Sequence, residues 1–179
     1  MSGAGARVRR AEPGDAAALA GLAEATFRDT YAAQNSAEDL EAYIAGHFGE
    51  GHQARELSDP RLRTWVATEE DGPTLVGYVQ LRIDAPCPVP GAGGPGAEVA
   101  RCYVRRDRQG LGVARMLIDA AVAGAREAGA AVVWLAVWQR NPRAIAFYAK
   151  SGFAIVGETT FTMGTDEQRD HVMALPLLS

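Results

Sequence analysis

The sequence has little cysteine and no excess of basic charge, and each shortage excludes a class of protein. Cys87 and Cys102 are the only two cysteines in 179 residues, and neither a CxxC nor an HExxH motif occurs. Two cysteines are too few for a disulfide framework or a four-cysteine zinc site, so a reducing, cytoplasmic setting fits best. The net charge of −4 offers no basic footprint for a nucleic-acid partner.

Long apolar segments are also missing. The first ten residues, MSGAGARVRR, contain no apolar run of the roughly 7–15 residues that a signal peptide needs. No segment reaches the roughly 20 apolar residues of a membrane helix. We therefore expect neither secretion through a signal peptide nor contact with a membrane. The three histidines, His47, His52 and His171, are too scattered to predict a metal site.

What is present indicates a globular protein. Hydrophobic residues make up 47% of the chain and charged residues 22%, which is ordinary for a packed domain. The length predicts one domain over residues 1–179, with its core at about 7–175. A Pro/Gly-rich segment at 85–96 is expected to form a loop, because its prolines lack backbone donors.

Hydrophobic periodicity predicts an alternation of helices and strands. The helices are expected at 13–31, 36–48, 52–57, 112–128 and 141–151, and the strands at 7–10, 64–68, 74–83, 97–104, 132–138, 154–161 and 171–175. The strand at 132–138 is a continuous apolar run, typical of a strand that is covered on both faces. Strand 97–104, helix 112–128 and strand 132–138 together predict a parallel crossover.

The turn between residues 104 and 114 is the most informative segment. Gly110, Gly112 and Ala114 would let a ligand approach the backbone, and the unpaired amides at the following helix start can hold a phosphate or pyrophosphate. A tight, closely packed turn is the alternative interpretation. A P-loop would need GxxxxGK[ST], and a dinucleotide fingerprint would need glycine where Arg115 stands, so neither ATP nor NAD is predicted.

Two motifs give the sequence a family resemblance. Residues 109–114, QGLGVA, resemble the Q/RxxGxG/A motif of the GNAT superfamily of N-acetyltransferases, and residues 141–153 resemble that family's NxxAxxFYxKxGF helix. Segments at 26–31, 34–36, 134–138 and 157–173 resemble bacterial spermidine/spermine N-acetyltransferases of the PaiA type. The resemblance implies an α/β fold, with a mixed, mostly antiparallel twisted sheet, one splayed parallel strand pair and flanking helices.

The resemblance also implies acetyl-CoA as the cosubstrate, with no metal. The residues that it places at the cofactor are Cys102, Tyr103, Val104, Gln109, Gly110, Leu111, Gly112, Val113, Ala114, Asn141, Arg143 and Lys150. Taken by itself, Asn141 is fully explained as a helix N-cap. Cys102, a lone cysteine in an apolar strand, is more typical of a small buried hydrophobe than of a nucleophile.

Acetyl transfer to an amine needs an acid for the leaving thiolate and a base for the attacking ammonium. By resemblance the acid is Tyr148, although an aromatic residue at that helical spacing is usually part of a core. The base is expected to be Glu98, because simple alternation places it on the same strand face as Ala100 and Cys102. Relatives often carry a second glutamate at the position of Ala100.

The acceptor is expected to be a primary amine of a small molecule, in particular a polyamine such as spermidine or spermine. Asp29 and Glu41 lie in the N-terminal helical part where the family forms its acceptor cleft, and a polycation would need such acidic residues. The alternatives are a protein N-terminus, an aminoglycoside, or a non-catalytic regulator that binds acyl-CoA. The oligomeric state, including a homodimer, is left open.

Overall fold

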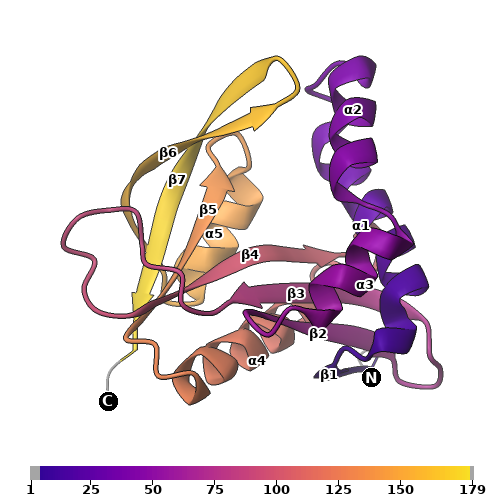
Figure 1. Cartoon of the computed structure of the whole chain (residues 1–179), viewed down its shortest axis with the longest axis horizontal. Helices are drawn as coiled ribbons and strands as arrows, with labels where there is room; N and C mark the ends of the chain where they lie inside the picture. Colours follow the sequence, from indigo (N-terminus) through magenta and orange to yellow (C-terminus); the bar gives the residue numbers. More distant parts are fainter. Residues whose placement is uncertain (1–4, 178–179) are drawn as a thin grey trace.

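A seven-stranded mixed sheet organises the chain in the computed structural model, which describes residues 5–177 (Figure 1). The strand order is β1-β2-β3-β4-β5-β7-β6. The strands are β1 (Ala6–Arg10), β2 (Leu62–Glu69), β3 (Leu75–Arg82), β4 (Gly96–Val104), β5 (Val132–Trp138), β6 (Ala154–Met163) and β7 (Asp166–Pro176). The α-helices are α1 (Ala16–Tyr31), α2 (Ala37–His47), α3 (Glu50–Ser58), α4 (Val113–Glu127) and α5 (Pro142–Lys150).

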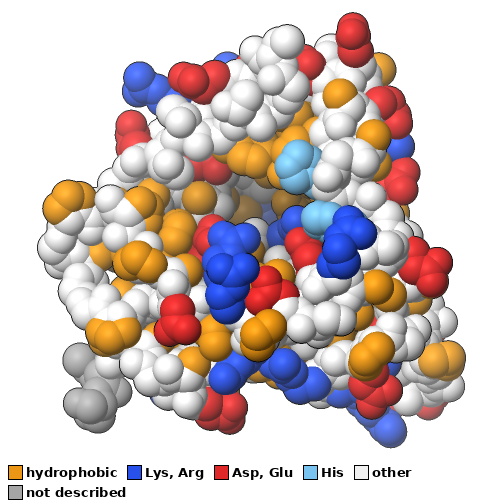
Figure 2. All heavy atoms as spheres, in the orientation of Figure 1, with side chains coloured by type: hydrophobic (Ala, Val, Ile, Leu, Met, Phe, Trp, Pro, Cys, Tyr) orange, Lys and Arg blue, Asp and Glu red, His pale blue; other side chains and the backbone are white. Residues whose placement is uncertain are grey.

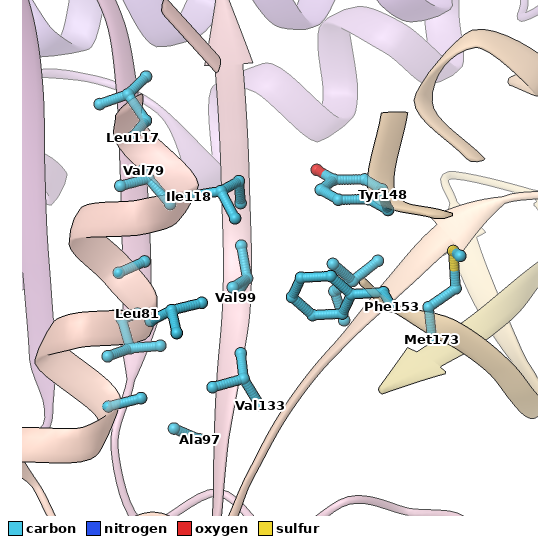
Figure 3. Packing of buried hydrophobic residues seen from close by; sticks show 14 of the residues in the cluster. Val79, Leu81, Ala97, Val99, Leu117, Ile118, Val133, Tyr148, Phe153 and Met173 are labelled. Carbon is cyan, nitrogen blue, oxygen red and sulfur yellow. The ribbon is translucent and has the colours of Figure 1, made fainter. Parts of the chain in front are cut away.

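Helices cover both faces of the sheet, and two apolar clusters hold them there. Helices α1 and α2 pack through Leu19, Phe27 and Ile44 against Tyr78 on one face, where α3 also lies. Helix α4 packs through fully buried Leu117 on the other face, together with α5, as Figure 3 shows. Within residues 5–177, every helix is too short or too polar to reach across a bilayer.

Strands β4 and β5 form the one parallel pair of the described sheet, as the crossover through α4 predicts. Their register covers only three residues each, from Gly96 to Glu98 on β4 and from Val132 to Trp134 on β5. Beyond these residues the two strands diverge, although both continue for several positions. The sheet is therefore open between the second half of β4 and the second half of β5.

A β-bulge at Ala100 decides which side chains of β4 face which layer. Arg101 pairs with Gln80 and Val99 pairs with Leu81, which leaves Ala100 as the extra residue. Directly opposed residues share a face, so Glu98, Arg101 and Tyr103 point toward α1–α3, while Val99 and Cys102 point toward α4. The expectation that Glu98 and Cys102 share one face is therefore wrong.

The last hairpin is longer than the sequence pattern predicts. Strand β6 continues to Met163 and β7 already starts at Asp166, whereas the predicted strands were 154–161 and 171–175. Residues 166–170 read DEQRD and carry no apolar alternation, so the pattern hides a strand that is held by its ladder to β6. The extension brings the hairpin tip close to α2.

Candidate active site

A cavity of about 860 Å³ occupies the opening between β4 and β5. Its walls come from α1, the end of β4, the turn before α4, the end of β5 and α5. Twelve of the predicted site residues line it: Asp29, Cys102, Tyr103, Val104, Gln109, Gly110, Gly112, Ala114, Asn141, Arg143, Tyr148 and Lys150. Four others do not: Leu111 is exposed, Val113 is buried in the core, Glu98 lies on the part of β4 that still pairs with β5, and Glu41 lies on α2.

The glycine turn has the geometry of an anion site. Gly110 and Gly112 have φ of +77° and +85°, a region that side chains disfavour, and Gly112 is the N-cap of α4. A Cβ added at either position would meet no atom within 4 Å, so the space beside the backbone is open. The first amides of α4 have no partner within their own helix and carry its positive dipole end. These observations fit a bound pyrophosphate.

Gln109 ties three elements of the cavity together. Its Nε2 donates to the carbonyl oxygen of Val104 at 3.1 Å, and its Oε1 accepts from Arg143 at 2.7 Å. The strand end, the glycine turn and α5 are thereby held in one arrangement. Asn141 caps α5 through its Oδ1, which accepts from the amide of Ala144 at 3.1 Å. The capping role inferred for Asn141 from the sequence is therefore confirmed.

The side chains of Tyr148 and Cys102 contact each other in the cavity wall. Burial raises the pKa of the Cys102 thiol to about 12, although the adjacent Tyr148 hydroxyl lowers it. Such a thiol is protonated at neutral pH and is a poor nucleophile. Burial also raises the pKa of Tyr148 well above its ordinary value. Tyr148 therefore stays protonated at neutral pH, and Figure 3 shows its hydroxyl directed from α5 toward β4.

Glu98 lies beside the opening and is paired. Its Oε2 accepts from Arg82 at 2.7 Å. Burial raises the pKa of Glu98, and the nearby Arg82 and Arg101 oppose that rise. A carboxyl group with a raised pKa is a stronger base than an ordinary one, but a proton from the cavity would have to reach Glu98 through water.

The acidic residues expected at the acceptor side have different surroundings. Asp29 is exposed on α1 and lines the cavity. Glu41 on α2 is bound by Arg28, whose guanidinium also donates to Glu24 at 2.9 Å. Arg28 thus neutralises Glu41, while no ion pair of Asp29 occurs among residues 5–177.

Two features of the acceptor side escaped the sequence pattern. Glu56 of α3 accepts from Arg101 at 2.8 Å and from Gln80 at 2.9 Å, which forms a partly buried polar cluster between α3 and the sheet. An aromatic wall surrounds Tyr31, whose ring centroid lies 5.5 Å from that of Trp138 and 6.4 Å from that of Phe161. Figure 2 shows this face hollowed, with charged, histidine and hydrophobic side chains at the rim of the hollow.

The comparison with family models decides the identity of this site. A model of the acetyltransferase (GNAT) family matches residues 20–153, which include the glycine turn and α5. The chain belongs to this family. This GNAT protein is therefore an acetyl-CoA-dependent N-acetyltransferase, and the motif resemblance and the fold expected from the sequence are confirmed.

Individual relatives agree with the family and do not name one acceptor. An uncharacterised N-acetyltransferase of Mycobacterium tuberculosis is 33% identical over 164 residues, covering 92% of this chain and 99% of the relative. A streptothricin acetyltransferase of Streptomyces lavendulae is 27% identical, covering 94% and 93% of the two chains. The crystal structure of a PaiA N-acetyltransferase of Thermoplasma acidophilum with coenzyme A superposes with a TM-score of 0.78 at 21% identity, covering 97% and 99%.

Proposed function

We propose that this GNAT enzyme transfers the acetyl group of acetyl-CoA to a primary amine of a small molecule, with a polyamine as the preferred acceptor. The observation that carries the proposal is the cavity of about 860 Å³ at the β4–β5 opening. The glycine turn and Tyr148 lie on its α4–α5 side, and Asp29 lies on its α1 side. Donor and acceptor can therefore enter from opposite faces and meet in the opening.

The residues divide the chemistry between them. The amides after Gly112, with Gln109, Arg143 and Lys150, hold the cofactor phosphates, and backbone groups at 102–104 hold the pantetheine arm and polarise the thioester carbonyl. The neutral amine attacks the carbonyl carbon, the C–N bond forms and the C–S bond breaks. Tyr148 donates a proton to the departing thiolate. Before the attack Glu98 takes one proton from the ammonium ion through water. The second proton, which the nitrogen loses as the amide forms, passes to solvent water, and Tyr148 regains its proton from solvent.

Two contacts support a small acceptor over a protein N-terminus. Asp39 Oδ1 accepts from the Thr165 amide at 3.0 Å, and Asn35 Oδ1 accepts from Gln168 Nε2 at 2.6 Å. These hydrogen bonds join the α1–α2 segment to the β6–β7 hairpin across the acceptor side. A peptide that extended past the reacting nitrogen would have to separate them.

A comparison of acceptors tests the proposal. We would measure kcat/KM for spermidine, n-butylamine, streptothricin and a peptide with a free N-terminus, at low and high salt. We expect spermidine to be acetylated best and its KM to rise with salt, because ions screen the attraction of a polycation. Asp29→Asn should raise the KM for spermidine, and Glu38→Gln on the exposed side of α2 is the matched control.

Equal efficiency for spermidine and n-butylamine would refute the polyamine acceptor. A clear preference for the peptide or for streptothricin would replace it with that acceptor.

A further inference from the structure

Asp170 is a buried carboxylate on the acceptor side that the chemistry above does not use. On β7 it lies directly opposite Trp138 of β5 and Thr159 of β6. Opposed residues share a face, so Asp170 points to the same side of the sheet as Trp138. Trp138 itself lines the cavity at the β4–β5 opening. Asp170 therefore lies one strand behind the cavity wall.

The carboxylate lacks the partners that burial normally demands. Asp170 is only 7% exposed, and its Oδ1 is buried without a hydrogen-bond partner among the described residues. No ion pair is formed by Asp170 anywhere in residues 5–177. An unpaired buried carboxylate is costly, and native proteins rarely keep one without a reason.

The groups that face Asp170 are aromatic or uncharged. Tyr31 of α1 is close enough for Asp170 to contribute to the raised pKa of its phenol, after the larger effect of burial. Trp138 from β5 and Thr159 from β6 carry no charge, and the phenol of Tyr103 from β4 interacts with that of Tyr31. His171 is next in sequence and lies on the opposite face of β7, and its effect is to lower the pKa of the Asp170 carboxyl group.

We propose that Asp170 is the counter-ion that receives the ammonium group of the acceptor, with Tyr31 and Trp138 as the aromatic walls of that subsite. A carboxylate flanked by aromatic rings suits an alkylammonium ion, since the rings attract the cation and the carboxylate compensates its charge. The inference rests on the proposed function, because it names the residue that binds the amine of that reaction.

The ionisation of Asp170 gives the subsite a pH signature. Burial raises the pKa of Asp170 to about 6, with the nearby His171 opposing the rise. Above that pH the carboxylate is charged and binds an ammonium ion, whereas below it the neutral acid does not. Affinity for the amine should therefore fall as the pH is lowered through about 6, where an alkylamine stays fully protonated.

Asp170→Asn tests the proposal, with Glu158→Gln as the matched control. Glu158 is the ladder partner of His171 on β6, so this substitution removes a carboxylate one strand away. Binding of spermidine and of n-butylamine to the CoA-loaded full chain is measured by calorimetry at pH 7.5 and pH 5. We expect Asp170→Asn to weaken both at pH 7.5 by about tenfold or more, and Glu158→Gln by less than about twofold.

The kinetic measurement separates binding from chemistry. Asp170→Asn should raise the KM of the amine about tenfold with a small change in kcat, and should abolish the fall of kcat/KM near pH 6. Asp170→Ser replaces the Asn variant if that variant does not fold, as judged by its melting curve. An unchanged affinity and an unchanged pH profile in the variant would overturn the inference, as would the absence of amine binding to the wild type.

The two proposals fail differently. If the wild type acetylates amines and Asp170→Asn does so with the same KM, only the role of Asp170 is wrong. If the wild type binds amines through Asp170 but releases no CoA with any of them, the proposed function is wrong and the subsite stands.

Discussion

The hydroxyl of Tyr148 lies beside the thiol of Cys102, in the cavity at the β4–β5 opening. Tyr148 belongs to α5 and Cys102 to β4, so this contact joins the helix of the second motif to the strand that holds the cofactor. The thiol stays protonated because burial raises its pKa to about 12. This favours direct attack by the amine over an acetyl-cysteine intermediate.

Tyr148→Phe should lower kcat roughly ten- to a thousandfold, because the variant keeps the buried ring but loses the proton donor. The ring packs against Phe147 and Phe153, with centroids 5.2 and 5.9 Å away, so the melting temperature and the affinity for acetyl-CoA should change little. Presteady-state kinetics would establish that chemistry limits turnover. A near-normal kcat under that condition would show that Tyr148 is only a packing residue.

Gly112→Val should abolish the stabilisation of the protein by acetyl-CoA, because the side chain fills the approach to the helix amides. Gly129→Val is the matched control, since Gly129 follows the same helix with φ of +79° and its Cβ would also enter open space. Both variants should lose roughly 1–2 kcal/mol from backbone strain. Thermal shift with acetyl-CoA separates them: the Gly129 variant should respond like the wild type. If acetyl-CoA raises the melting temperature of the Gly112 variant as much as that of the wild type, the pyrophosphate does not bind at this turn.

Glu98→Gln should lower kcat/KM about tenfold or more at pH 7 and less at pH 9.5, where more of the amine is already neutral. Asp59→Asn is a suitable control, because it also breaks a carboxylate–arginine pair, with Arg61 at 3.1 Å. The check is a pH–rate profile for each variant. If kcat/KM falls by the same factor at both pH values, another group takes the proton of the amine.

Asp170→Asn should change stability in a pH-dependent way. The pKa of Asp170 is about 6 in the folded chain against an ordinary 3.8, so the native state binds more protons between these values. The carboxyl group therefore supports folding below about pH 4, and this contribution is lost as pH rises through 6. Urea denaturation at pH 4 and at pH 7.5 should show this. Relative to the wild type, the free energy of unfolding of the variant should be about 1–3 kcal/mol higher at pH 7.5 than at pH 4. If the difference in free energy of unfolding between variant and wild type is the same at both pH values, burial does not raise the pKa of Asp170.

Local chemistry made much of this molecule predictable from sequence. The cap at Asn141 and the glycine turn before α4 depend on neighbouring residues, and the structure shows the cap formed. The parallel crossover followed from the apolar run at 132–138. These features need no knowledge of distant contacts.

The misses depend on relationships that a linear pattern does not contain. One extra residue at Ala100 reverses the facing of everything before it on β4, and strand alternation gives no sign of such a bulge. Tyr31, Trp138, Phe161 and Asp170 come from four different elements, and only the strand order brings them to one wall. Asp170 has no ion-pair partner among residues 5–177 because the side chains that these elements bring beside it are aromatic or uncharged.

Amine-dependent release of CoA shows most directly whether this cavity transfers an acetyl group. The protein is first shown to bind acetyl-CoA by thermal shift, and free thiol is then followed with spermidine present and absent. Release should require the amine, yield N-acetylspermidine by mass spectrometry and fall sharply in Tyr148→Phe. Binding of acetyl-CoA without release for any amine tested would contradict acetyl transfer in this cavity and would indicate a protein that only senses acyl-CoA.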